Sequence, residues 1–71
     1  MIPNLDHEHV WHEFRRDYPQ TANNATTDDE ARYLITIDGA PFARFYQYLS
    51  AKQLMDWALE NHDDHDWRII E

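Results

Sequence analysis

Residues 32–49 read RYLITIDGAPFARFYQYL, and this stretch decides the fold. Its first part, Arg32–Ile37, is rich in β-branched and aromatic residues, which favours a strand. Asp38-Gly39 then gives a strong signal for a two-residue hairpin turn, because both residue types tolerate positive φ. Phe42–Leu49 continues as a second strand, and Pro41 suits its first position because proline has no N–H to donate. The stretch therefore predicts an antiparallel hairpin.

The segment before the hairpin predicts a helix from about His7 to Tyr18. Asp6 is a suitable N-cap, and Leu5 and Val10 have the spacing of a hydrophobic staple. Pro19 disfavours helical geometry at the residue before it and so marks the end. At 100° per residue, one stripe of this helix collects the following side chains: His7, Val10, Trp11, Phe14 and Tyr18.

Between this helix and the hairpin, Gln20–Glu30 is polar and has no large apolar residue, so we expect a loop. Thr27 and Glu30 match a capping box, which leaves a short helical turn over residues 28–32 as the alternative.

A second helix is predicted after the hairpin, from Ala51 to His62, with Ser50 as its N-cap. The apolar stripe of this helix is expected to contain Ala51, Leu54, Met55, Ala58, Leu59 and His62. Trp57 projects about 120° away from that stripe. The indole is therefore expected either to face solvent as a binding residue or to pack against residues 20–30 or the hairpin.

The segment Asp63-Asp64-His65-Asp66 predicts a charged turn, and Trp67–Ile70 predicts a short terminal strand. The fold class that follows is α+β: one small domain over residues 1–71, in the order α-β-β-α-β, with a three-stranded sheet and two helices. A right-handed crossover places the last strand parallel to the second strand and beside the first.

The composition combines a formal charge of -8 in 71 residues with three Trp, four Tyr and three Phe. Such aromatic content indicates a folded domain and not an acidic disordered tail. The acids are concentrated at the two ends, in residues 1–31 and 56–71, and the middle of the chain is mildly basic. This charge disfavours direct binding of nucleic acid or of an anionic membrane, and it favours a basic protein surface as the partner.

The residues give no support for a reaction or a cofactor. The chain has no cysteine, no glycine-rich phosphate loop and no apolar span, so we expect no enzyme and a cytoplasmic location. His9 and His12 have the spacing of metal ligands on one helix face, as do Glu8 and His12, but a solvated face of Glu–His pairs is favoured over a metal site.

The acidic turn also resembles a fragment of a calcium loop, but it lacks the glycine and the distal glutamate that such loops need. No metal ion is therefore expected. The residues expected to bind a partner are exposed aromatics and the acids near the second helix: Trp57, Glu60, Asp63, Asp64, Asp66, Tyr46 and Tyr48. Tyr46 and Tyr48 enter this set because they alternate on one face of the second predicted strand.

The arrangement of a hairpin over Tyr33–Leu49, a helix that Ser50-Ala51 opens and that runs to Leu59, and a strand at Trp67–Ile70 resembles that of small acidic phage-encoded proteins. Among these are inhibitors of host transcription, restriction and CRISPR machinery, some of which mimic DNA. The resemblance is architectural and assigns a role to no residue.

The function expected is that of a small acidic protein-binding module. It would inhibit or modulate a larger, nucleic-acid-handling protein by occupying a basic surface, either as a monomer or as a homodimer. The alternative is a structural or assembly protein, or an accessory subunit, that acts as a homodimer. In that case the terminal strand leaves a sheet edge open for pairing.

Overall fold

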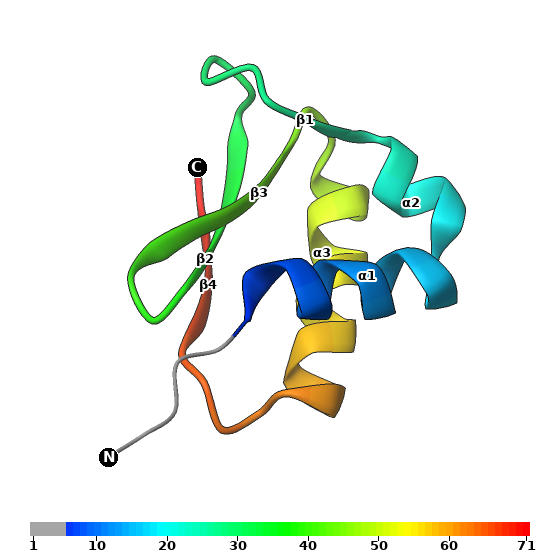
Figure 1. Ribbon diagram of the computed structural model, residues 1–71. Helices are drawn as coiled ribbons and strands as arrows, with labels where there is room; N and C mark the ends of the chain where they lie inside the picture. The colour runs from blue at the N-terminus through cyan, green and yellow to red at the C-terminus, as the bar shows by residue number, and fades with distance from the viewer. Residues whose placement is uncertain (1–5) are drawn as a thin grey trace.

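The computed structural model describes residues 6–71 and has two layers: a four-stranded antiparallel sheet, and three helices that lie together on one side of it (Figure 1). The elements along the chain are α1 His7–Asp17, α2 Pro19–Asn23, β1 Ala25–Thr26, β2 Tyr33–Ile37, β3 Ala40–Phe45, α3 Tyr48–Asn61 and β4 Trp67–Ile70. In space the strands follow the order β1-β3-β2-β4, and every neighbouring pair is antiparallel. The α+β class is confirmed. The expected three strands, two helices and α-β-β-α-β order were wrong.

The hairpin of β2 and β3 forms around Asp38-Gly39 as expected. Asp38 has a φ of 52° and Gly39 a φ of 85°, the pair of positive angles that a type I′ turn requires. A register shift between Ile35 and Thr36 places a bulge in this hairpin. β4 lies beside β2 and antiparallel to it, and therefore runs parallel to β3, which is the arrangement that the right-handed crossover predicts.

The polar segment over residues 20–30 is not a simple loop, and this accounts for the extra elements. Pro19 opens α2 at its first position, where a missing N–H and a fixed φ are favourable. β1 then adds to the edge of β3, with Ala25 opposite Phe45. Residues 28–31 form a turn and no helix: the Ala31 N–H donates to the Asp28 carbonyl at 3.1 Å. The short elements α2 and β1 are stabilised by the neighbouring β3 and α3. Their own residues therefore need no periodic hydrophobic pattern, and none could be recognised in the sequence.

The second predicted strand is shorter than expected, and the helix after it begins earlier. β3 ends at Phe45, and α3 begins at Tyr48 after an extended Gln47. Ser50 therefore lies buried inside the first turn of α3 and is not its cap. Tyr46 and Tyr48 consequently do not share a strand face. An alternating pattern near the start of a helix can predict either a strand or a helix. Ser50 and Ala51 are buried as part of α3, and this packing favours the helix.

α1 follows its prediction closely. The Asp6 side chain accepts the His9 N–H at 3.3 Å, and the helix ends just before Pro19. The staple expected between Leu5 and Val10 involves a residue outside the described range. Val10 and Phe14 are buried, and the core between the helices and the sheet is completed by the following side chains: Ala22, Ile35, Ile37, Phe45, Ala51, Leu54, Trp57, Ala58 and Trp67.

Candidate functional site

The two acidic ends of the chain meet on the helical side of the molecule. Glu13 Oε2 lies 3.0 Å from His62 Nε2, and the Trp57 indole N–H donates to Asp17 Oδ2 at 2.9 Å. These contacts hold α1 against the C-terminal half of α3, so that acids far apart in sequence share one surface. We call this surface the acidic face; its members are Glu13, Asp17, Asp56, Glu60, Asp63 and Asp64.

Trp57 is a core residue, so the expectation that it faces solvent was wrong. Only 5% of its surface is exposed, and its ring packs edge-on against Phe14 with the centroids 5.2 Å apart. The alternative expectation, that Trp57 is packed, holds, and the rings that pack against it are those of Phe14 in α1 and of His62. Its indole N–H is the main cause of the lowered pKa of Asp17, which keeps that carboxylate charged in acid.

A groove of about 260 Å³ runs beside Trp57 along the solvent side of α3. Its walls come from the end of α1 and from successive turns of α3: Tyr18, Leu49, Lys52, Gln53, Asp56, Trp57 and Glu60. Tyr18 and Leu49 are exposed, and two acids, Asp56 and Glu60, also line the groove. Lys52 donates to Asp56 at 2.8 Å, which raises the pKa of the lysine and neutralises part of this charge. The groove is mostly polar, and it offers the carboxylate of Glu60 beside the apolar groups of Tyr18 and Leu49, which suits a cationic side chain with an apolar stem.

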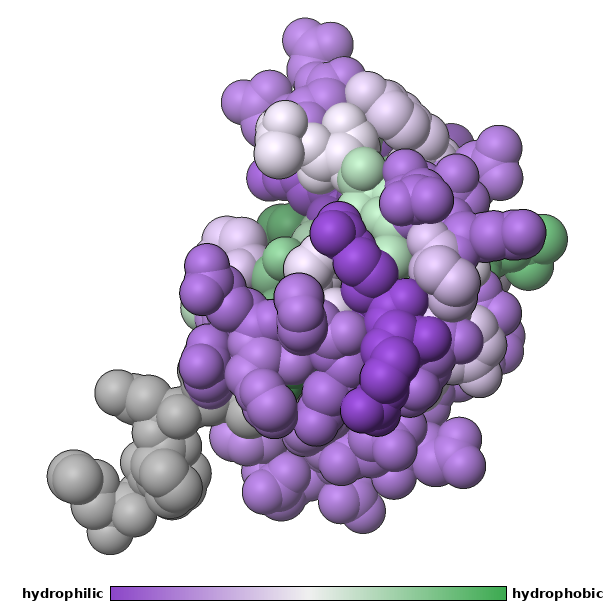
Figure 2. Space-filling view, turned by 45° about the vertical axis from the view of Figure 1, so that its right-hand side comes forward, coloured by the Kyte–Doolittle hydropathy of each residue, from purple (hydrophilic) through white to green (hydrophobic). Residues whose placement is uncertain are grey.

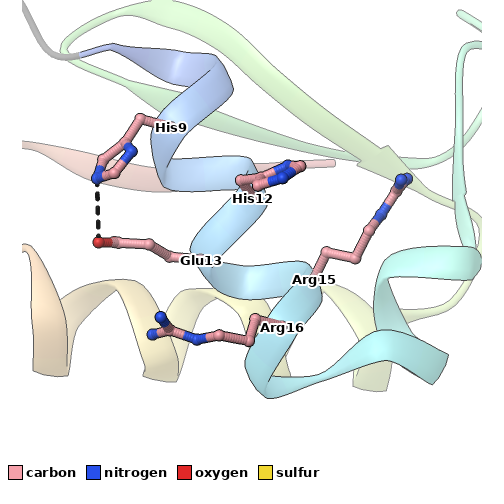
Figure 3. A pocket seen from close by; sticks show the side chains of 5 residues that line it. All are labelled: His9, His12, Glu13, Arg15 and Arg16. Atoms are coloured by element: carbon pink, nitrogen blue, oxygen red, sulfur yellow. Dashed lines mark ion pairs between the residues drawn. The ribbon is translucent and has the colours of Figure 1, made fainter.

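The outer surface of α1 forms a shallow hollow of about 420 Å³, in which Glu13 is the one acid and Arg15 and Arg16 are cationic (Figure 3). His9, Glu13 and Arg16 extend to one side of the helix, and His12 and Arg15 extend to the other. His9 Nε2 lies 3.3 Å from Glu13 Oε1, so this carboxylate contacts two histidines. Within residues 6–71, no three His, Asp or Glu side chains are grouped so that they could hold a metal ion.

The surface in this region is strongly polar. Figure 2 shows the helical side turned forward, with hydrophilic residues over most of it and hydrophobic atoms in a central band, in a small group to its left and at the right-hand edge. A partner that docks here therefore meets charged and polar groups over most of the contact, with few apolar anchors.

The structure does not bring all seven expected site residues together. Tyr46 and Tyr48 lie at the start of α3, and Asp63 and Asp64 follow its end, about 20 Å away for a helix of this length. The Tyr46 hydroxyl donates to Asp28 Oδ2 at 2.8 Å. The Glu30 N–H, and after it this hydroxyl, lowers the pKa of Asp28. The Tyr48 ring packs against Tyr33, with the centroids 5.6 Å apart. The two tyrosines are exposed, but they belong to a different end of the molecule.

Sequence reasoning missed Leu49 and Asp56, which share a wall of the groove with Glu60. These positions follow helical spacing on the solvent side of α3, so a helix drawn from Tyr48 would have placed them on one face. Tyr18 was expected on the apolar stripe of α1, and it lies at the exposed end of that stripe.

Asp66 has a structural role beside the hairpin turn. Its N–H donates to Asp38 Oδ1 at 2.9 Å, and its carbonyl accepts the Asp38 N–H at 2.8 Å. His65 Nδ1 lies 2.8 Å from the other oxygen of Asp38. The Asp66 N–H and then the His65 side chain lower the pKa of Asp38. These contacts join the α3–β4 connection to the turn between β2 and β3.

We expect Asp38→Asn to make the free energy of unfolding depend less on pH in the acid range. The pKa of Asp38 is lower in the folded protein than in the unfolded chain, so its carboxylate stabilises the fold above the unfolded value of about 3.9. This stabilisation is lost as the pH falls through the folded-state pKa. Urea unfolding between about pH 2 and pH 6 should show a gap between wild type and the variant that closes in acid. A difference in unfolding free energy that stays the same at every pH would contradict this role of Asp38. The matched control is Asp29→Asn, which changes an exposed residue.

Comparisons of the chain with protein-family models, with curated proteins and with solved structures found no match. Within the described residues, no helix is both long enough and apolar enough to cross a bilayer.

Proposed function

We propose that the protein is an acidic protein-binding module that inhibits or modulates a larger protein by docking its acidic face on a basic surface. The observation that carries this proposal is the meeting of the two acidic ends through the Glu13–His62 and Asp17–Trp57 contacts. Acids from both ends of the chain thereby lie near one another on the helical side of the fold.

Part of this charge is free for a partner. Within residues 6–71, neither Glu60 nor Asp63 has a cationic group within 4.0 Å, while Asp17 and Asp56 have one each. Carboxylates that have no cationic neighbour attract a basic protein and accelerate the encounter with it.

The groove beside Trp57 supplies the position for an anchor. An arginine or lysine that enters it can lay its methylene stem on Tyr18 and Leu49 and direct its charge towards Glu60. Basic surfaces rich in such residues commonly bind nucleic acid. The partner class that we infer is therefore a nucleic-acid-handling protein, whose basic surface the acidic face would occupy in competition with nucleic acid.

Glu60→Lys is expected to slow association with the partner about tenfold at low salt and to flatten the salt dependence of the rate. The matched control is Asp29→Lys, which changes the net charge equally on an exposed loop outside the acidic face. The partner is first captured at low salt with the wild-type chain and identified by mass spectrometry, and association rates are then measured by stopped flow.

Glu60→Lys and Asp29→Lys should differ in association rate only if the docking site is local to the acidic face. Equal slowing would show that net charge alone steers the encounter. If neither variant changes the rate, the acidic face is not the docking surface.

A further inference from the structure

The N-terminus of α3 presents backbone N–H groups that have no acceptor among the described residues. The first hydrogen bond of this helix runs from the Ala51 N–H to the Gln47 carbonyl at 3.3 Å, so the N–H groups of Tyr48, Leu49 and Ser50 precede it. Gln47 provides no side-chain cap, and the first turn contains no acidic residue. These N–H groups and the positive end of the helix dipole therefore attract an anion.

A small pocket opens at this end of the helix, with a volume of about 110 Å³. Asn24 at the end of α2 and Tyr46, Gln47 and Ser50 at the start of α3 line it. Liquid water takes about 30 Å³ per molecule, so the pocket has room for a group of a few heavy atoms. None of the four lining residues is charged, so no charged group of the lining competes for an anion.

The side chain of Ser50 is an independent indication of a ligand. Only 9% of its surface is exposed, and its hydroxyl makes no hydrogen bond with any described residue. Among the described residues, however, no polar side-chain atom is both fully buried and unpaired. The hydroxyl therefore keeps an opening to the outside, and the pocket that Ser50 lines provides it. An O–H group enclosed in this way donates to the same anion as the first-turn N–H groups.

The charges around the pocket favour a carboxylate over a phosphate. No arginine or lysine lines the pocket, although these residues are the usual partners of phosphate in proteins. The chain has a formal charge of -8, and Asp28 contacts a lining residue because it accepts the Tyr46 hydroxyl at 2.8 Å. A ligand with a single negative charge is repelled less by these acids than a dianion.

We propose that the N-terminus of α3, together with Ser50 and Asn24, binds a carboxylate group. The carboxylate accepts hydrogen bonds from the first-turn N–H groups and the Ser50 hydroxyl, and the side-chain amide of Asn24 is a further donor on the pocket wall. A free small acid and the C-terminus of a protein chain both present this group. The site lies at the opposite end of α3 from Glu60 and is separate from the acidic face.

Acetate is expected to shift the backbone amide NMR signals of Tyr48, Leu49 and Ser50 in a saturable way. The whole chain is titrated with sodium acetate near neutral pH while sodium chloride holds the ionic strength constant, and inorganic phosphate is titrated in the same way. Ser50→Ala should weaken acetate binding about threefold or more, because it removes one donor and leaves the N–H groups in place. N-acetylalanine distinguishes the two sources: it should bind more tightly than acetate if the site takes the end of a protein chain, and equally if it takes a free acid.

Asn24→Asp should weaken acetate binding by at least about tenfold, because it adds a negative charge to the pocket wall. The matched control is Asn23→Asp, which makes the same change at the neighbouring exposed residue, outside the pocket lining. This control changes the net charge equally and should keep most of the wild-type affinity.

Acetate that shifts the three amide signals no more than chloride does would overturn the proposal. Tighter binding of inorganic phosphate than of acetate would overturn the choice of a carboxylate. Unchanged binding in Ser50→Ala, or equal losses in the two aspartate variants, would overturn the pocket as the site. The titrations contain no protein partner, so their outcome is independent of docking through the acidic face.

Discussion

Trp57→Ala is expected to lower the free energy of unfolding by about 3–5 kcal/mol, the usual cost of removing a large buried aromatic side chain. Trp57 fills the contact between α1 and α3, where it packs against Phe14 and hydrogen-bonds to Asp17. The whole stability of a small domain is only about 5–15 kcal/mol, so this loss removes a large share of it. Urea unfolding followed by circular dichroism measures the loss.

Trp57→Phe separates packing from hydrogen bonding in this contact. The phenyl ring keeps much of the contact with Phe14 but has no N–H for Asp17, so the loss of stability should be smaller than for alanine. The pKa of Asp17 should also rise towards its ordinary value, which NMR titration can follow. A fully folded Trp57→Ala protein that only loses its partner would contradict the core position and restore the role of an exposed binding residue.

The hairpin and α1 could be predicted because local residues alone specify them. Asp38-Gly39 requires no distant contact to form its turn, and Asp6 and Pro19 mark the two ends of α1. The position of β4 beside β2 also follows from a general rule of handedness. These features depend on backbone geometry, which short stretches of sequence determine.

The burial of Trp57 could not be read from one helix, because α3 packs against two neighbours. Ala51, Leu54 and Ala58 face the sheet, while Trp57 faces α1, so the buried arc is wider than one amphipathic stripe. Leu59 shows the opposite error, since it was expected in the buried stripe and is 49% exposed. Both errors arise from tertiary contacts that helical spacing does not contain.

The acidic face could not be predicted from the sequence either, because it also depends on tertiary structure. The acids of α1 and those near the end of α3 are separate in sequence, and only the crossing of the two helices joins them. The sequence could therefore indicate the sign of the net charge but not which acids share a surface.

Phe14→Ala is expected to cost about 3–5 kcal/mol of unfolding free energy and to disturb the acidic face as well. Phe14 is fully buried, and its ring lies within 5.7 Å of those of Trp11, Tyr18 and Trp57. A helix of the length of α1 is not stable alone in water, so its order depends on this packing. Loosening α1 separates Glu13 and Asp17 from α3, and partner association should slow even in molecules that remain folded. The exposed Tyr18→Ala, which removes a neighbouring ring, is the control and should cost less than about 1 kcal/mol. If Phe14→Ala unfolds no more easily than Tyr18→Ala, then α1 is not held through the Phe14–Trp57 contact, and the joining of the two acidic ends needs another cause.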